Sequence, residues 1–268
     1  MNSTPKNNEP TSSESPSLAA NFNKYFRIRV ANTKALREKV FEIRHDVYCR
    51  ELGWEEQQKS NTEVDEFDDY SYYCLLEHIA TNTFAGCVRI VIPPANQLDL
   101  KTPFETHCLS SVRSDVIDFN KLPRGSFGEV SRLAVPEAFR RRRNEANKPF
   151  SINGIGGGHV FTDEERRNFP SIAVGLYLAI LKLAQLCNHQ VAFVMMEPRL
   201  NRRLKRFGFP FTQAGDVIEY HGSRALFALT SKDSMSQLNP ELMELYQSIS
   251  AQVSEQTTLI PYTDPADR

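Results

Sequence analysis

The 268-residue chain lacks a long hydrophobic run, and no stretch approaches the ~18 apolar residues that a membrane span requires. Its N-terminus also lacks a basic segment followed by an apolar core, which is the pattern of a secretory leader. We therefore expect a cytoplasmic protein without a membrane span.

The sequence also lacks an excess of either charge and any paired cysteine motif. Its formal net charge is −1, so no field of the whole protein would attract nucleic acid. The five cysteines are scattered, with no C-x-x-C pair and no histidine at ligand spacing. This pattern favours reduced thiols over a disulfide or zinc framework.

Composition divides the chain into three parts. Residues 1–20 are rich in Ser, Pro, Asn and Glu and have little to bury, so we expect a disordered N-terminal lead. Residues 21–232 carry the periodic patterns of one folded domain, interrupted by an irregular insertion at 137–169. Residues 233–268 are expected to form a C-terminal helix and a flexible tail.

Hydrophobic periodicity predicts a mixed α/β fold of the α+β type. Helices are expected at 34–52, 171–186, 199–207 and 240–250, with one or two short ones in 104–117. Strands are expected at 25–30, 72–79, 85–92, 128–135, 191–196, 216–220 and 223–229. Because strands and helices do not alternate regularly, the pattern favours a mostly antiparallel central sheet flanked by helices over a doubly wound sheet.

The strand Gly128–Val135 places two opposite charges, Glu129 and Arg132, where a core would exclude them. Buried charges are rare unless they are paired or used, which makes this strand the first candidate for a catalytic floor. Regular alternation would send the two side chains to opposite faces. If both face one cleft, the strand must contain a β-bulge between them.

Two further arginines and an acidic segment look complementary. Arg44 falls on the apolar stripe of the 34–52 helix, and Arg89 lies in the middle of an apolar strand. Residues 63–69 hold five carboxylates, which repel one another unless they are solvated, metal-bound or paired with arginine. The alternatives are an Arg44 that extends to solvent and an exposed acidic loop. Calcium is less favoured because the D-x-[DN]-x-[DN]-G pattern is missing.

Basic residues gather at two places in the second half of the chain. The helix 199–207 has a positive face, and residues 140–143 are four arginines in a row. They are either solvated surface or a docking site for an acidic partner. The docking candidates are Arg140, Arg141, Arg202, Arg203 and Arg206. The glycine cluster at 154–158 fits a surface insertion better than a phosphate loop, because no Lys-Ser or Lys-Thr follows it.

A set of motifs carries a family resemblance over residues 25–135. It comprises Arg44-x-x-x-Tyr48, Trp54, Glu63-x-Asp65-x-x-Asp68, Gly86-x-x-Arg89 and Glu129-x-Ser131-Arg132. With the order of elements, the set resembles the acyl-homoserine-lactone synthases of the GNAT acyltransferase superfamily. The whole chain resembles more closely the acyltransferases associated with PEP-CTERM/exosortase systems and the N-acyl amino acid synthases. The GNAT pyrophosphate signature, R/Q-x-x-G-x-G/A, is missing, since residues 140–145 contain no glycine.

The resemblance implies a GNAT-like acyl-CoA N-acyltransferase fold and a reaction without metal or bound cofactor. A fatty acyl group would pass from acyl carrier protein, or acyl-CoA, to the amine of an amino acid or similar small acceptor. The attacking amine must lose a proton, which makes Glu129 the expected base, beside Arg132. The residues expected to bind and orient the acceptor are Arg44, Tyr48, Trp54, Asp65, Asp68 and Arg89. Apolar residues of 171–186 and 191–196 are expected to line an acyl tunnel.

Two other functions fit the same sequence. One is an acyl-homoserine-lactone synthase that uses S-adenosylmethionine. The other is a catalytically silent binding module of the same fold, in which the charges only stabilise the structure. The sequence leaves the acceptor and the acyl length open.

Overall fold

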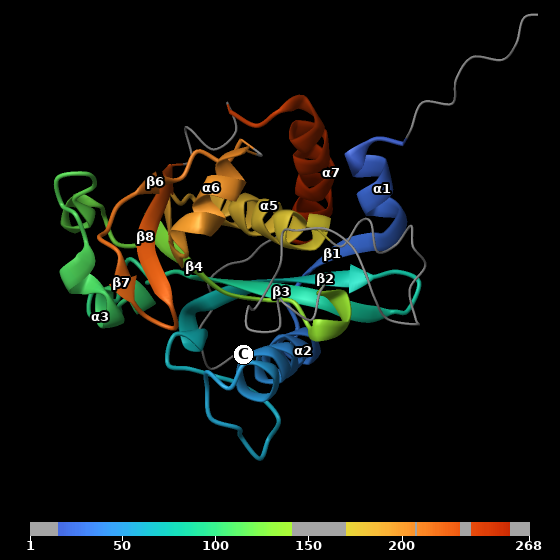
Figure 1. The fold of residues 1–268 in the computed structure, drawn as a ribbon, viewed down its shortest axis with the longest axis horizontal. Coiled ribbons are helices and arrows are strands. Elements are labelled where there is room, and N and C mark those ends of the chain that lie inside the picture. The colour runs from blue at the N-terminus through green and yellow to red at the C-terminus, as the bar shows by residue number, and fades with distance from the viewer. Residues whose placement is uncertain (1–15, 141–169, 207, 231–236, 258–268) are drawn as a thin grey trace, which may run out of the picture.

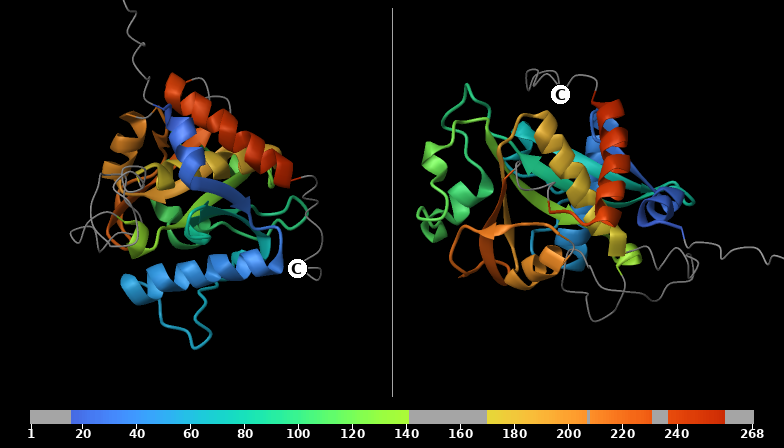
Figure 2. Two further views of the ribbon diagram at one scale, coloured as in Figure 1. Left: turned by 90° about the vertical axis from the view of Figure 1, so that its right-hand side faces the viewer. Right: turned by 90° about the horizontal axis from the view of Figure 1, so that it is seen from above.

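The computed structural model describes residues 16–140, 170–206, 208–230 and 237–257, and in it one open sheet lies between two helical layers. Figure 1 shows α1 (Leu18–Tyr25), α5 (Pro170–Leu186) and α7 (Pro240–Gln256) on one face and α2 (Lys34–Arg44) on the other. The side view in Figure 2 shows the same separation. The predicted mixed α/β architecture is therefore confirmed.

The sheet follows the order β1-β2-β3-β4-β5-β8-β6, and β7 pairs with β8. All neighbours run antiparallel except β4 and β5, which are parallel. The strands are β1 (Phe26–Val30), β2 (Ser71–His78), β3 (Thr83–Val91), β4 (Phe127–Ala134), β5 (Val191–Met196), β6 (Thr212–Gln213), β7 (Ile218–Glu219) and β8 (Ser223–Thr230). The central parallel pair joins two antiparallel halves of the sheet.

The predicted buried helix is α5, whose side chains from Ile172 to Leu181 are almost all excluded from solvent. Its Gly175 lies against Phe22 of α1, and a Cβ there would come within 2.5 Å of the phenylalanine ring. Glycine lets α1 approach α5 closely enough to bury Phe22 completely. The remaining helices are the short α3 (Pro103–His107) and the basic α6 (Pro198–Arg206).

Several predicted boundaries differ from the structure. Helix α1 begins at Leu18, inside the segment expected to be disordered, because Ser17 caps it and Phe22 finds a buried site. The 34–52 helix is α2 followed by a π-helix, His45–Glu51, and Gly53 ends it with a positive φ of 62°. The short strand β6 was not expected. The glycine cluster and most of the predicted 137–169 insertion lie outside the described residues.

Helix α7 completes the domain and covers the sheet edge formed by β1. Its Leu245, Ile249 and Val253 are buried in the core shared with α5. Two glutamine side chains of α7 bond the free backbone edge of β1. Gln252 accepts from the Ile28 N–H at 2.8 Å, while Gln256 accepts from the Val30 N–H and donates to the Ile28 carbonyl. These side chains take the place of a further strand.

Candidate active site

Strand β4 contains a bulge at Arg132. In the β3–β4 ladder Arg89 is opposite Ser131 and Cys87 is opposite Ala134, so β4 has one residue more than β3 in this interval. Arg132 takes up the extra length with a left-handed φ of 51°. The bulge brings Arg132 to the same cleft as Glu129, as the sequence required.

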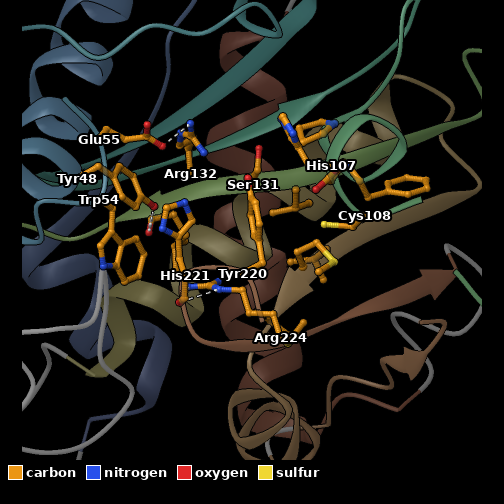
Figure 3. Close-up of a pocket in the computed structure, with 18 of the residues that line it drawn as sticks. Tyr48, Trp54, Glu55, His107, Cys108, Ser131, Arg132, Tyr220, His221 and Arg224 are labelled. Atoms are coloured by element: carbon orange, nitrogen blue, oxygen red, sulfur yellow. Dashed lines mark hydrogen bonds and ion pairs between the residues drawn. The ribbon is translucent and has the colours of Figure 1, made fainter. Parts of the chain in front are cut away.

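Strands β4 and β5 separate after Val130 and Val194, just before the bulge, and a pocket opens between them. They pair from Phe127 to Val130 and from Val191 to Val194, and their remaining residues are not paired with each other. The pocket encloses about 100 Å³, far more than the roughly 15 Å³ that one water needs. Figure 3 shows its lining, with Tyr48, Trp54 and His221 grouped together and Tyr220 between His221 and Cys108.

Glu129 lies at the floor of the pocket with only 2% of its surface exposed. Its carboxylate accepts a hydrogen bond of 2.6 Å from the Phe104 backbone N–H. Burial raises the pKa of Glu129 to about 8, and this hydrogen bond and the charge of Arg89 oppose the rise only in part. A carboxyl group with this pKa can both accept and release a proton near neutral pH.

The short helix α3 holds the N–H that meets Glu129. Thr102 and Glu105 form a capping box at its start, with Pro103 as the first helical residue. The Glu105 carboxylate also binds both terminal nitrogens of Arg124, at 2.7 and 2.9 Å. Glu105 raises the pKa of Glu129 further through its negative charge. Helix α3 thus fixes both the position and the protonation of Glu129.

A buried charge network lies behind the pocket. Arg44 is completely buried and binds Glu63 at 2.5 Å and Asp68 at 2.7 Å, while Arg89 binds Asp65 at 2.5 Å and Asp68 at 2.8 Å. Burial alone would raise the pKa of Asp68, but Arg44 and Arg89 hold it well below its ordinary value. The acidic segment is therefore paired with arginine, and its alternative as a fully solvated loop is wrong for Glu63 and Asp68, which are 5% and 3% exposed.

Arg132 connects this network to the pocket. Its guanidinium contacts the carboxylates of Glu55, Glu63 and Asp65, each at 3.2 Å. Each buried charge has a partner of opposite sign, and this pairing offsets the free-energy cost of burying the set. Arg44, Asp65, Asp68 and Arg89 lie in the network and not in the pocket lining. Their expected contact with an acceptor stays a prediction.

Aromatic side chains form one wall of the pocket. The Tyr48 hydroxyl donates to the Leu133 carbonyl on the bulged strand at 2.9 Å. Trp54 stacks on His221, with ring centroids 5.3 Å apart, and the Arg224 guanidinium lies 5.4 Å from the Trp54 ring centre. The structure thus places both predicted aromatic residues at the pocket.

Another part of the lining is mainly apolar. It includes Tyr177 of α5 and Val194, Met195 and Met196 of β5. These are the two segments expected to line an acyl tunnel. Unbranched methionine side chains adapt to ligands of variable shape.

The predicted docking residues have different environments. Arg140 is only 8% exposed and forms an ion pair with Glu51, so the expectation that it docks a partner is wrong, because its charge is already used inside the fold. Arg202 and Arg206 are exposed on α6, whereas Arg203 is half-buried. Arg141 lies outside the described residues.

Sequence reasoning missed several pocket residues. Glu55, Tyr220 and His221 reach the pocket from loops, His107 from the end of α3 and Arg224 from the start of β8, without a periodic pattern that marks them. Ser131 had a signal, since it stands between Glu129 and Arg132, and its hydroxyl accepts from Arg89 at 3.0 Å. His221 and Arg224 lie in and after the tight β7–β8 turn, where His221 and Gly222 have positive φ angles.

Residues 43–147 match the model of the acetyltransferase (GNAT) domain family. Three solved structures share the architecture. TofI, in a ternary complex with an inhibitor and MTA, is 17% identical over 81% of this chain and 99% of its own, with a TM-score of 0.53. BjaI, a CoA-dependent acyl-homoserine lactone synthase with SAM and isopentyl-CoA, is 15% identical over 85% of this chain and 89% of its own, with a TM-score of 0.52. FeeM, an N-acyl amino acid synthase from uncultured soil microbes, is 15% identical over 80% of this chain and 94% of its own, with a TM-score of 0.50.

The fold is a GNAT fold. The predicted fold class is thereby confirmed, and so is the predicted likeness to acyl-homoserine-lactone and N-acyl amino acid synthases. At these identities the likeness to the solved structures establishes the fold alone. No curated protein matches the sequence significantly. Within the described ranges, none of the helices combines the length and the apolar character needed to cross a bilayer.

Proposed function

We propose that this protein is an N-acyltransferase that moves a fatty acyl group from acyl carrier protein, or from acyl-CoA, to the amine of an amino acid or similar small acceptor. The observation that carries the proposal is Glu129, a buried carboxyl group with a pKa of about 8 at the floor of a pocket between two separating strands. Pocket carboxyl groups with strongly shifted pKa values mark proton-transfer sites.

The pKa of Glu129 suits an α-amino acceptor. The α-amino group of a peptide terminus titrates at about 7.7–8.0, and the free α-carboxylate of an amino acid raises this value, so an α-ammonium group passes its proton to Glu129 at a modest cost in free energy. A lysine-like amine titrates at about 10.4 and would give up its proton to Glu129 less readily. We therefore favour an α-amine as the nucleophile, deprotonated by Glu129 directly or through one water.

The transfer forms one bond and breaks another. The amine nitrogen attacks the thioester carbonyl carbon, the tetrahedral intermediate collapses, the carbon–sulfur bond breaks and an amide remains. The proton held by Glu129 passes to the leaving thiolate. We propose that backbone N–H groups at the bulge of β4 stabilise the oxyanion, because β5 does not pair with β4 there.

The charge network would act as a support for the site. We propose that Arg44, Asp68 and Arg89 fix residues 55–68 against the sheet. Arg132 would then connect this segment to the pocket rim through its ion pair with Asp65. Tyr48 and Trp54 would then wall the acceptor. The acyl chain would extend past Tyr177 toward the methionines of β5.

We propose that the acyl group is donated by its thioester with acyl carrier protein. Residues 140–145 contain no glycine, so the usual turn for the CoA pyrophosphate is missing. Arg202 and Arg206 lie exposed on α6, which begins two residues after Met196 at the pocket. An acidic carrier protein could dock there through complementary charge.

Two wider assignments also remain proposals. The five cysteines are free thiols, which supports the cytoplasm as the compartment. The association with exosortase systems rests on the sequence resemblance.

A second function is supported by the BjaI structure, which contains SAM. Mass spectrometry of lipid extracts from cells that express the protein separates the two. Acylated amino acids are expected, and acyl-homoserine lactones would instead identify a signal synthase.

E129Q is the matched control, since glutamine keeps an acceptor for the Phe104 N–H. Loss of a general base lowers the rate about 10²- to 10⁴-fold. Product formation by folded E129Q at the wild-type rate would overturn the role of Glu129 as the base, whereas absence of product from the wild type would leave the silent binding module.

A further inference from the structure

Two arginines reach the pocket, and they differ in how their charge is used. Arg132 contacts three carboxylates. Arg224 forms two long hydrogen bonds of 3.4 Å, both to the His221 backbone carbonyl. Within the part of the chain that the structure describes, no carboxylate lies within ion-pair distance of Arg224. Glu55 and Glu129 line the same pocket, but neither pairs with Arg224, and a half-buried guanidinium without an ion-pair partner is suited to an anionic ligand.

Arg224 lies on the same face of the sheet as Glu129. In the ladders Glu129 is opposite Phe193, and Phe193 is opposite Ala228. Arg224 precedes Ala228 by four residues on β8, an even number, so alternation returns its side chain to the same face. Two strand spacings and four residues along a strand separate the Cα atoms of Glu129 and Arg224 by roughly 16 Å. Both side chains line the pocket, which therefore lies between the two residues.

The direction of Arg224 is set by its neighbours. Its guanidinium lies over the ring of Trp54, which itself stacks on His221 (Figure 3). Cation–π contact restricts the side chain without neutralising its charge. The positive charge of Arg224 also lowers the pKa of Tyr48 and Cys108, on opposite sides of the pocket, against the burial that raises both. Its field therefore extends across the cavity.

From these observations we infer that Arg224 binds the α-carboxylate of the acceptor, so that the substrate class is a free α-amino acid. The inference rests on the proposed function. Arg224 would hold the carboxylate at one end of the pocket, and Glu129 would face the α-amine at the other. S-adenosylmethionine carries the same α-amino and α-carboxylate groups, and the products distinguish it from an ordinary amino acid.

The test compares amino acids with their carboxamides as acceptors, at a fixed acyl-thioester concentration. The wild type is expected to prefer the free acid. Arg224→Gln is expected to raise KM for the acid about 10- to 100-fold, as for the loss of a charged hydrogen bond, and to leave kcat and the carboxamide KM nearly unchanged. Arg224→Lys should recover part of the preference. Arg113→Gln, at an exposed arginine outside the pocket lining, is the matched control and should keep the wild-type preference.

The outcomes separate the two claims. If the wild type acylates neither acids nor carboxamides nor S-adenosylmethionine, the proposed function fails and the inference fails with it. If product forms but Arg224→Gln keeps the acid-to-amide ratio of the wild type, only the Arg224 assignment is overturned. Melting temperatures of the variants show whether a lost preference reflects lost folding.

Discussion

Glu129 illustrates how one residue trades stability for reactivity. An exposed glutamate titrates at about 4.3, whereas burial raises the pKa of Glu129 to about 8. Between these values the folded protein keeps a proton that the unfolded chain has lost. The free energy of unfolding therefore falls as pH rises from about 4.5 to 8. The contribution of Glu129 to stability is therefore lowest in the pH range where the proposed base would be ionised.

E129Q should remove this pH dependence. The variant cannot ionise, so we expect its melting temperature to exceed that of the wild type by several degrees above pH 8. Near pH 5 the carboxyl group is protonated, and the difference should shrink. Melting curves recorded from pH 5 to 9 test this, and two parallel curves would contradict the burial of an ionisable Glu129.

At the residue scale, the sequence identified the charged residues of the site, together with Tyr48 and Trp54, better than it identified the residues near the β7–β8 turn. Glu129, Arg132 and Arg44 were identifiable because a charge inside an apolar pattern needs a partner. His221 and Arg224 were not, since a turn and the first residues of the following strand show no such contrast. Arg140 was misassigned because a run of arginines looks solvated, while its partner Glu51 lies 89 residues away in the chain.

At the scale of elements, the sequence pattern alone does not predict the bulge in β4, and only the proposed function does. Alternation put Glu129 and Arg132 on opposite faces, and only their assignment to one cleft required an extra residue. Most strands and helices were predicted close to their observed bounds, because their apolar periods are regular. Helix α1 and strand β6 were missed since each is short and depends on tertiary contacts.

Helix α3 offers a prediction about tuning through an element. E105Q removes a negative charge that raises the pKa of Glu129, while the glutamine can still cap Thr102. We expect the acid limb of the pH profile of kcat to move to lower pH by less than about one unit. Steady-state kinetics from pH 6 to 9 measure the shift. An unchanged or alkaline-shifted limb would show that α3 does not tune the base.

At the scale of the whole molecule, the net charge of −1 leaves partner recognition to local patches. We expect R202E/R206E to raise KM for acyl carrier protein thioesters about tenfold, with an effect that weakens at high salt. An acyl-pantetheine thioester carries no carrier charge and serves as the control donor. Equal losses with both donors would mean that α6 acts on the fold and not on docking.

The cover of β1 by α7 can be tested in the same way. Q252A/Q256A removes the side-chain partners of three backbone groups on an edge strand. At about 0.5–1.5 kcal/mol for each bond, we expect a loss of about 1.5–4.5 kcal/mol in the free energy of unfolding, together with slow self-association. Urea unfolding and light scattering measure both. Substitution S254A, at an exposed position of the same helix, should cause neither effect.

This arrangement also has a consequence for biosynthesis. The glutamines that complete β1 are separated from it by 224 and 226 residues, almost the whole length of the chain. At about 5–20 residues per second, a ribosome needs on the order of ten seconds or more to make that interval. During this time the nascent chain carries an open strand edge, which is a binding site for chaperones. The edge of β1 is covered only when α7, which follows every described strand in the chain, has been synthesised.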